Sequence, residues 1–452
     1  VESDRLRLWH KVSHRFRVPK ASVFVHLHSP VVYASPRSMT LFRLFEMLLR
    51  EDLASYLYDA SMVGYSCRVS VKPSGLEIYV GGYSEKIPEL LETLSKRMVS
   101  LMTELIAVGA GGGEGGRPPD GGLLKKFRTQ REMLMRDTRN FAMDPPYELA
   151  DYHSRMLLED RAWHVDQYLE ELEVGNLSPG ECGAAVESLL AGRLVAEGLV
   201  AGNVDAKGAQ EIGNVILGTL LAAGSLPLSD EEVPRYRSKR LPTEGEAQDI
   251  FGDGCTYPIA VEELAAGPSE ENDAIEFVLQ APTQGSEGSA ILHLIGHMAY
   301  TSAFQQLRTV EQLGYIVYAS VRQTSGGGQG LSISVQGSEF SPAIMQERVE
   351  AWLVVFREQL ERMPEEELAE EAGAVVSILL ERDLKLSHEV GRFWGDISES
   401  FEKTDKNRMP TFDRLEKLAV ELTISGVDTG VKFRRGKKPQ TAGELKSKVL
   451  SF

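Results

Sequence analysis

The sequence predicts an α+β protein made of two tandem homologous domains, each an antiparallel-rich sheet with helices packed on one face. Three observations support this prediction: an internal repeat of roughly 250 residues, the same order of strands and helices in each copy, and a composition typical of globular proteins. At 452 residues the chain is also too long for one ordinary domain.

Two aligned segments define the repeat. Leu57–Tyr65 aligns with Leu307–Tyr315 at an offset of 250 residues. Gly75–Gly82 aligns with Gly330–Gly337 at an offset of 255. The five additional residues fall in a glycine-rich turn around 326–328, and surface loops tolerate insertion. A shift confined to a turn is expected of a real duplication.

The second copy shows the order of elements most clearly. Apolar residues at helical spacing predict an amphipathic helix through Ile291–Ala299. Gly314 suits the left-handed position that ends a helix. Next comes a predicted strand, Tyr315–Val321, rich in β-branched and aromatic residues. Leu331–Val335 alternates apolar and polar residues, which predicts a strand with one buried face.

A long helix is predicted to begin at Ser341 and Pro342, because serine can cap a helix and proline suits its first position. Apolar residues at helical spacing predict its buried face: Val349, Trp352, Leu353, Phe356 and Leu360. Strands followed by helices in both copies are typical of α+β domains.

A turn and a short polar segment near Glu232 predict the domain boundary, which gives domains 1–232 and 233–452. Within the first domain, residues 109–122 are nearly all glycine, proline and charged, as in a flexible surface insertion. Gly111–Gly116 fits the pattern G-x-G-x-x-G, but a dinucleotide site needs a strand before it and a helix after it. Here a predicted helix precedes and prolines follow, so we interpret the segment as a linker.

Charge and cysteine usage exclude several classes of partner and site. The net charge of −17 argues against a nucleic-acid backbone or an anionic membrane surface, and is compatible with a neutral or basic peptide. No apolar run approaches the ~18 residues of a membrane span. The three cysteines lie far apart and form no C-x-x-C, so we expect no disulfide framework, no thiolate zinc site and a cytoplasmic location.

The histidines of the chain do not predict a catalytic metal site. His293 and His297 lie one helical turn apart, a spacing that can bind zinc. Gly296 stands where the motif H-x-x-E-H has its glutamate, so the base that would activate a bound water is missing. The pair at 388–389 begins like H-E-x-x-H, but Arg392 replaces the second histidine. We interpret His293 and His297 as structural, with adventitious metal binding as the alternative.

Arg308 and Tyr315 are the remaining candidates for chemistry. The repeat places Tyr58 at the position of Arg308, so the arginine belongs to the second copy alone. Tyr65 stands at the position of Tyr315, so a tyrosine there can also be structural. A phenol can donate a hydrogen bond to a developing oxyanion while a guanidinium binds a peptide carbonyl. The alternative is an arginine at a solvated helix end and a tyrosine that merely begins a strand.

The sequence LRTVEQLGY of Leu307–Tyr315 resembles the C-terminal half of the insulin-degrading-enzyme family, the M16 zinc peptidases also called insulysins or pitrilysins. Similar segments extend over most of the chain: Phe16–Ala21, Leu49–Tyr83, Asn140–Leu158, Arg235–Arg237 and Leu386–Ile397. The tail after Val427 matches the family only loosely.

This resemblance implies an M16/LuxS-metallohydrolase-like fold and the third and fourth domains of a four-domain zinc endopeptidase for short peptides. It implies that Arg308 binds the substrate main chain and that Tyr315 stabilises the tetrahedral intermediate. Zinc and the H-x-x-E-H motif would belong to an N-terminal half, in the same chain or in a separate subunit, without which this half is expected to be inactive. The alternative is an inert M16-fold structural or partner subunit, but such a scaffold would need neither Arg308 nor Tyr315.

Overall fold

In a computed structural model of the protein, the described residues are 2–110, 121–222, 224–229, 231–242, 246, 259–261, 271–281, 285–403, 410, 412–427, 431 and 438–452. Most of the glycine-rich segment at 109–122 and much of the tail after Val427 therefore lie outside the described residues.

The chain forms two compact units, and each is assembled from three separate segments. The first comprises Val1–Asn140, Trp163–Arg235 and Asp383–Met409. The second comprises Phe141–Ala162, Tyr236–Arg382 and Pro410–Phe452. The central crossing at Arg235–Tyr236 lies near the predicted boundary, but each unit also contains a segment from the other side of it.

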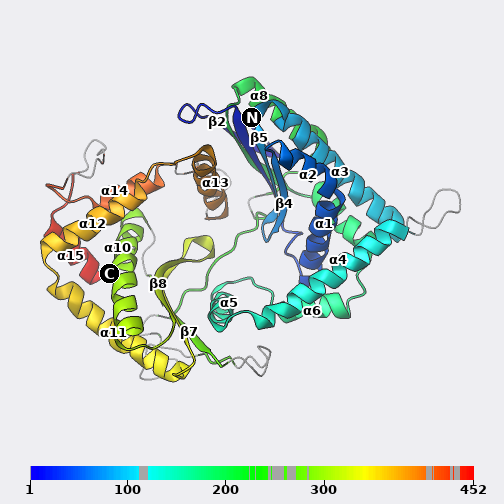
Figure 1. The fold of residues 1–452 in the computed structure, drawn as a ribbon. Coiled ribbons are helices and arrows are strands. Elements are labelled where there is room, and N and C mark those ends of the chain that lie inside the picture. Colours follow the sequence, from blue (N-terminus) through cyan, green and yellow to red (C-terminus); the bar gives the residue numbers. More distant parts are fainter. Residues whose placement is uncertain are drawn as a thin grey trace. The chain divides into compact units, whose positions relative to one another are not determined.

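The first unit contains a six-stranded sheet in the order β1-β2-β6-β3-β5-β4. Figure 1 labels β2, β5 and β4 of this sheet. Its strands are β1 (Glu2–Ser3), β2 (Leu6–Val12), β3 (Lys20–His28), β4 (Ser66–Lys72), β5 (Gly75–Tyr83) and β6 (Val195–Gly202). All neighbours are antiparallel except β2 and β6. Side chains alternate between the faces of a strand, so Val23 and Val25 of β3 enter the main core while Phe24 and His26 face the other way.

Helices from the first half of the chain form the core of this unit with one face of the sheet. They are α1 (Pro36–Asp52), α2 (Ala54–Met62), α3 (Ile87–Gly109), α4 (Gly121–Asn140), α6 (Val165–Glu173), α7 (Pro179–Leu190) and α8 (Ala206–Thr219), with a short 3₁₀ turn η1 (Ser84–Lys86) before α3. Ser35 caps α1 by accepting a hydrogen bond from the Ser38 N–H at 3.0 Å, and Pro36 follows at the first position. Phe42 of α1 and Met98 of α3 are fully buried in the shared core.

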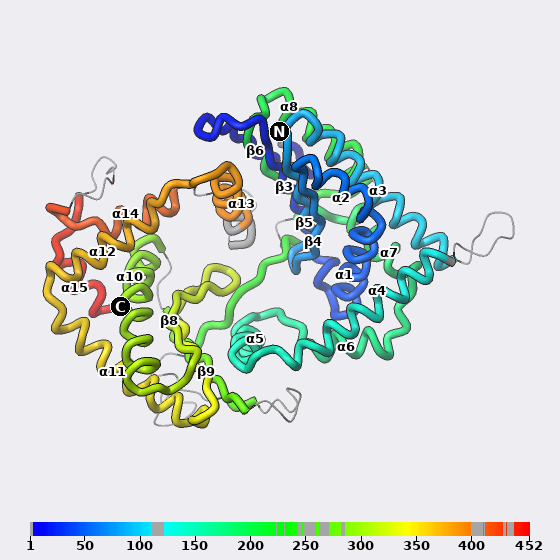
Figure 2. Tube along the Cα trace, viewed as in Figure 1, coloured from blue at the N-terminus to red at the C-terminus, as the bar shows by residue number. Residues whose placement is uncertain are grey.

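A helix from the far end of the sequence covers the other sheet face. This is α13 (Leu386–Lys403), which packs on β3 and β6 and is traced in orange in Figure 2. The Trp394 ring stacks on Phe24 with centroids 5.1 Å apart, and its Nε1 donates to the Glu77 carboxylate at 2.9 Å. The predicted fold class is confirmed, and α13 adds a helix on the second face that the sequence did not indicate.

The second unit contains a three-stranded antiparallel sheet in the order β7-β9-β8. The strands are β7 (Asp273–Gln280), β8 (Ile316–Gln323) and β9 (Gln329–Gly337). Its helices are α5 (Pro146–Leu158), α10 (Ser286–Ala303), α11 (Pro342–Arg362), α12 (Glu365–Leu379), α14 (Arg414–Leu422) and α15 (Ala442–Ser451). Short helical turns are η2 (Phe141–Met143), η4 (Phe304–Val310) and η5 (Ser325–Gly327).

Both faces of the central strand β9 are buried, although its alternating sequence predicts one buried face. Ile333 and Val335 enter the core with α10 and α11, and Ser334 and Gln336 are as deeply buried on the opposite face. Helix α5 packs on β7 and β9 and covers that polar face. The serines and the glutamine are therefore buried against a helix and not exposed to water.

An ion pair and hydrogen bonds join α5 to the second sheet. Arg322 of β8 contacts Asp151 of α5 at 3.2 Å and also Glu276 of β7. Glu276 accepts further hydrogen bonds from Ser154 of α5 and, at 2.6 Å, from Ser332. The side chains of Arg322 and Glu276 are 8% and 4% exposed, so this pair is shielded from water and from salt.

The strand register supports the internal repeat. In the first sheet, Ser66 of β4 pairs with Gly81 of β5. Adding the sequence offsets of 250 and 255 gives Ile316 and Gln336, which form the corresponding pair of β8 and β9. The two hairpins therefore have the same register.

Helix α11 begins as predicted but is capped differently. Pro342 occupies its first position, whereas the Ser341 side chain makes no capping hydrogen bond. Four of the five predicted face residues are buried, and Leu353 is half-buried. Within the described ranges, no helix is long and apolar enough to cross a bilayer.

The turn with the five additional residues contacts the segment that leads into the second unit. The Ser238 N–H donates to the Ser325 carbonyl at 3.1 Å, and the Ser325 hydroxyl donates to Glu159 at 2.9 Å. Gly326 has a left-handed φ of 72°, and a Cβ on it would lie 2.8 Å from the Tyr236 carbonyl oxygen, so this position favours glycine. The insertion therefore has a contact role as well as being tolerated.

Candidate functional site

Arg308 lies near the end of a helix, as the sequence predicts. Helix α10 continues into the π-helical turn η4, in which the Glu311 N–H bonds to the carbonyl of Gln306, five residues earlier. The guanidinium Nη1 of Arg308 donates to the Gly314 carbonyl at 3.5 Å, and its carbon lies 5.5 Å from the centre of the Phe304 ring. These two contacts direct a half-buried cation toward the residue that precedes Tyr315.

The turn after η4 does not use Gly314 in the predicted way. Gln312, and not Gly314, adopts the left-handed backbone conformation, with φ of 53°. The glycine is needed for a different reason, because a Cβ on Gly314 would lie 2.2 Å from the Gln336 carbonyl oxygen. In the first copy, the equivalent Gly64 does take a left-handed φ of 86°.

Tyr315 stands immediately before strand β8, which begins at Ile316 and not at Tyr315 as predicted. Its side chain is 52% exposed. The phenol oxygen accepts a hydrogen bond from the side-chain amide of Gln336 on β9. The structure therefore brings Arg308 and Tyr315 to one turn of the second unit, with the phenol open to solvent.

Gln336 connects this turn to helix α5. Its side chain is buried, and its Oε1 accepts a hydrogen bond from the Tyr147 backbone N–H at 2.8 Å. The sequence analysis did not identify Gln336 or Tyr147. One available signal was that Gln336 replaces Gly81 in an otherwise matched repeat, as Arg308 replaces Tyr58.

Tyr147 presents a second phenol near Tyr315. Its hydroxyl donates to Glu148 at 2.9 Å, and this hydrogen bond, with burial and nearby carboxylate and phenol groups, raises the pKa of Tyr147. The groups that raise the pKa of Tyr147 include Tyr318 and Tyr315. Tyr147 stays protonated at neutral pH, with its proton engaged by Glu148.

The two histidines of α10 make local contacts. His293 bonds through Nδ1 to the Ser289 carbonyl at 2.7 Å, and His297 lies 3.3 Å from Glu371. Across the described ranges, no group of three or more His, Cys, Asp and Glu side chains could hold a metal ion. The described residues therefore do not fit a zinc site.

The described cysteines are poor nucleophiles. Cys67 and Cys182 are free thiols, and Cys255 lies outside the described residues. Burial raises the pKa of Cys67 to about 12 and raises that of Cys182 as well. Neither thiol forms an appreciable thiolate at neutral pH, which a nucleophile requires.

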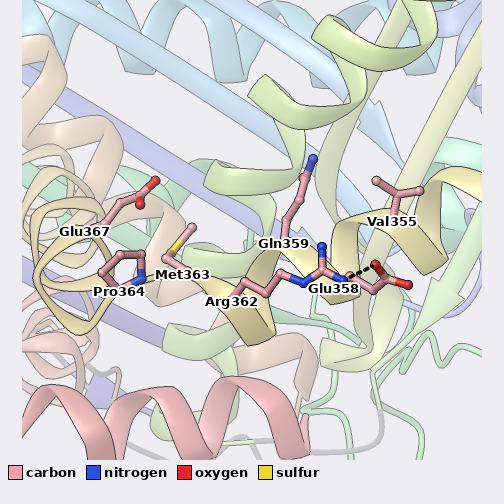
Figure 3. Close-up of a pocket in the computed structure, with 7 residues that line it drawn as sticks. All are labelled: Val355, Glu358, Gln359, Arg362, Met363, Pro364 and Glu367. Carbon is pink, nitrogen blue, oxygen red and sulfur yellow. Dashed lines mark hydrogen bonds and ion pairs between the residues drawn. The ribbon is translucent and has the colours of Figure 1, made fainter.

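A surface cavity of about 510 Å³ lies where α11 turns into α12 (Figure 3). It is lined by Val355, Glu358, Gln359, Arg362, Met363, Pro364 and Glu367. Arg362 donates to Glu358 at 3.0 Å in its wall, so the main charged groups neutralise each other. It contains neither Arg308 nor Tyr315 and is separate from the candidate site.

Two protein-family models match parts of the chain. Residues 1–171 match the model described as the middle or third domain of peptidase M16. Residues 294–394, which include η4 and β8, match the C-terminal lobe domain 4 of PQQ synthase PqqF-like proteins. Insulin-degrading enzyme from Homo sapiens is 29% identical over 396 residues, which cover 86% of this chain and 35% of that protein.

Over most of its length, the chain is similar to insulysin-like peptidases of the M16 family.

Two other relatives are similar to nearly the whole chain. The peroxisomal insulin-degrading enzyme-like 1 of Arabidopsis thaliana is 27% identical over 433 residues, covering 96% of the chain and 41% of that protein. A protein of Schizosaccharomyces pombe named putative zinc protease mug138 is 27% identical, covering 93% of the chain and 39% of its own length. The chain thus spans well under half of these relatives.

Solved structures show the same fold. Pitrilysin superposes with a TM-score of 0.72 at 18% identity, over 99% of the chain and 46% of pitrilysin. A peptidase M16 inactive domain from Pseudomonas fluorescens superposes with a TM-score of 0.59 at 11% identity, over 99% of the chain and 92% of that domain.

Proposed function

We propose that this chain is the C-terminal, non-zinc half of an insulysin-like zinc metalloendopeptidase that hydrolyses short peptides. The observation that carries the proposal is the exposed Tyr315 phenol, held beside Arg308 in the unit that matches a C-terminal lobe domain 4. The share of each relative covered, 35% to 41%, is that expected of one half of a longer enzyme.

In this proposal the two side chains have distinct roles. Tyr315 donates its hydroxyl proton to the oxyanion that develops on the scissile carbonyl, where a fixed donor is worth most. Arg308 binds a main-chain carbonyl of the peptide, because a guanidinium offers several donors in fixed directions. The chain supplies no hydrolytic nucleophile of its own in this scheme.

Zinc, its ligands and the general base are assigned to an N-terminal half, in the same polypeptide or in a separate subunit. Support comes from the absence of a metal-binding group among the described residues and from the relative named putative zinc protease. The chain alone is then inactive, and its partners are the N-terminal half and peptide substrates, with no nucleic acid or membrane. A cytoplasmic location completes the proposal, on the basis of the sparse cysteines.

The roles are tested by substitutions in the assembled enzyme. Tyr315→Phe is expected to lower kcat by ~10- to 1000-fold, the scale of losing one oxyanion donor. Arg308→Ala is expected to raise KM for the peptide more than it lowers kcat, since it removes ground-state binding. The matched control is Tyr300→Phe, at a tyrosine of α10 that is 54% exposed. It is expected to leave kcat and KM unchanged.

Wild-type kcat for Tyr315→Phe would remove the catalytic role of the tyrosine, and wild-type KM for Arg308→Ala would remove the binding role of the arginine. The second candidate is then a catalytically inert M16-fold subunit. It is favoured by the fold shared with the inactive M16 domain over nearly the whole of both chains. An enzyme whose activity is indifferent to both substitutions would support that candidate.

A further inference from the structure

We propose that Gln336, held by the N-terminus of α5, is a positioning residue that fixes the direction of the Tyr315 hydroxyl proton. The inference rests on the proposed function of Tyr315 and adds a third residue to the site of Arg308 and Tyr315. It is carried by the hydrogen bonds that join α5, β9 and the turn before β8.

Helix α5 begins with N–H groups that have no partner within the helix. The first N–H groups of a helix have no partner within it. Pro145 at the cap offers no side-chain hydrogen bond, and Pro146 has no N–H, so Tyr147 carries the first N–H of the helix. That N–H donates to Gln336 Oε1 at 2.8 Å, so a side chain of β9 caps α5.

The chemistry of the amide fixes which end of the Gln336 side chain faces each partner. A backbone N–H can only donate, so the carbonyl end of the Gln336 side chain must face α5. Its NH₂ end then faces Tyr315, and an NH₂ group can only donate as well. The phenol oxygen is therefore the acceptor, and its single proton points away from Gln336. In a side chain that is 52% exposed, this leaves the proton available to a substrate oxyanion.

The burial of Gln336 fixes this arrangement. Gln336 is 2% exposed, and its backbone pairs with Ile316, the residue after Tyr315. The hydroxyl of Tyr147 does not compete for the amide, because it is bonded to Glu148. A buried amide with a partner at each end has little freedom to turn over.

The first copy of the repeat cannot form this arrangement. Gly81 occupies the position equivalent to Gln336 and has no side-chain amide. The amide is therefore present in the copy that also has Arg308. A merely structural requirement of the repeated fold would have placed it in both.

The test is Gln336→Glu in the assembled enzyme. The carboxylate has the same shape and still accepts from Tyr147, but it accepts from the phenol instead of donating to it. The Tyr315 proton then turns inward, so kcat is expected to fall by ~10-fold or more, up to the loss in Tyr315→Phe, while KM stays near wild type. Lowering the pH protonates the new carboxyl, which can donate again, so the ratio of wild-type to variant kcat should shrink.

The same substitution in the Tyr315→Phe background separates positioning from structure. Without the phenol proton there is nothing to direct, so Gln336→Glu should have no further effect on kcat. An equal loss in both backgrounds, or wild-type kcat for Gln336→Glu where Tyr315→Phe is impaired, would overturn the inference and leave the proposed function standing. If Gln336→Glu lacks a cooperative melting transition, the neutral substitution Gln336→Met is compared in the same way, with and without Tyr315→Phe. If Tyr315→Phe itself has wild-type kcat, the proposed function fails first.

Discussion

At the scale of single residues, Glu197 is a buried carboxyl that the proposed mechanism does not use. It lies on β6 and accepts a hydrogen bond from the Trp9 indole at 2.8 Å. Burial raises the pKa of Glu197 to about 7, although the Trp9 hydrogen bond and the Arg7 charge act to lower it. The folded protein thus retains a proton that the unfolded chain releases near pH 4.5.

The sign of the pH dependence follows from that raised pKa. The stability that Glu197 contributes through proton binding is fully present below about pH 4.5 and is lost as the pH rises through about 7. Glu197→Gln keeps the acceptor for Trp9 and never ionises, so it should melt increasingly above the wild type as the pH is raised from 5 to 8. Melting curves across this range measure the effect.

His26 pairs with Glu197 across the sheet and has the opposite dependence. Burial, with the charge of Lys72, lowers the pKa of His26 to about 3, so its effect on stability changes between pH 3 and 6.5. Because His26 is present in both proteins, the difference between their melting temperatures isolates Glu197. A difference that is constant with pH would contradict the raised pKa.

Sequence reasoning identified the two candidate side chains but not what orients them. Arg308 and Tyr315 are close in sequence, so one helix end and one strand start suffice to place them. Gln336 is oriented by Tyr147, which lies 189 residues away. Gly314 was identified correctly as special, but for its backbone angle, whereas the constraint is the nearby carbonyl of Gln336. Both gaps concern distant contacts that periodicity does not encode.

At the scale of elements, the ion pair of Arg322 and Glu276 attaches α5 to the second sheet. Arg322→Met should lower the free energy of unfolding by about 3–5 kcal/mol, because it leaves the Glu276 carboxylate buried without its partner. Chemical denaturation of the chain measures this loss. The double variant Arg322→Met/Glu276→Gln should recover most of it, since no charge is then stranded.

A matched control is Arg357→Met on α11, which breaks an exposed pair with Glu361. Exposed pairs contribute ~0–1 kcal/mol, so this variant should be near neutral. Equal stabilities for Arg322→Met and Arg357→Met would show that the α5 pair does not anchor the helix.

The existence of most elements follows from local sequence, whereas their partners do not. The alternation of β9 and the spacing of α11 predicted a strand and a helix that the structure contains. The same patterns could not show that α5 covers the second sheet or that α13 covers the first. An amphipathic pattern shows that a helix has a buried face, but any apolar or satisfied polar surface can cover it.

At the scale of the whole molecule, the exchanged segments bind the two sequence halves together. Residues 1–232 alone would leave Phe24 and Glu77 of the first sheet without α13. Residues 233–452 alone would leave Gln336 and Glu276 without α5. We therefore expect each piece expressed alone to aggregate or to lack a cooperative melting transition, and co-expression of both to restore one complex.

Size-exclusion chromatography and thermal melting of the separate and co-expressed pieces measure this. Two monomeric pieces that each melt cooperatively, at the temperature of the intact chain, would show that the exchanged helices are dispensable for folding.

The exchange of α5 and α13 also constrains how such a chain can evolve. A substitution at Glu276 removes an acceptor of the Ser154 hydroxyl, which lies in the other half of the sequence. Related genes that recombined near their midpoint would unite sheets with helices that had diverged to fit other partners. Compensating changes should therefore appear in pairs across the midpoint, such as 151 with 322. Hybrid chains that keep each sheet with its exchanged helix should fold more often than those that do not.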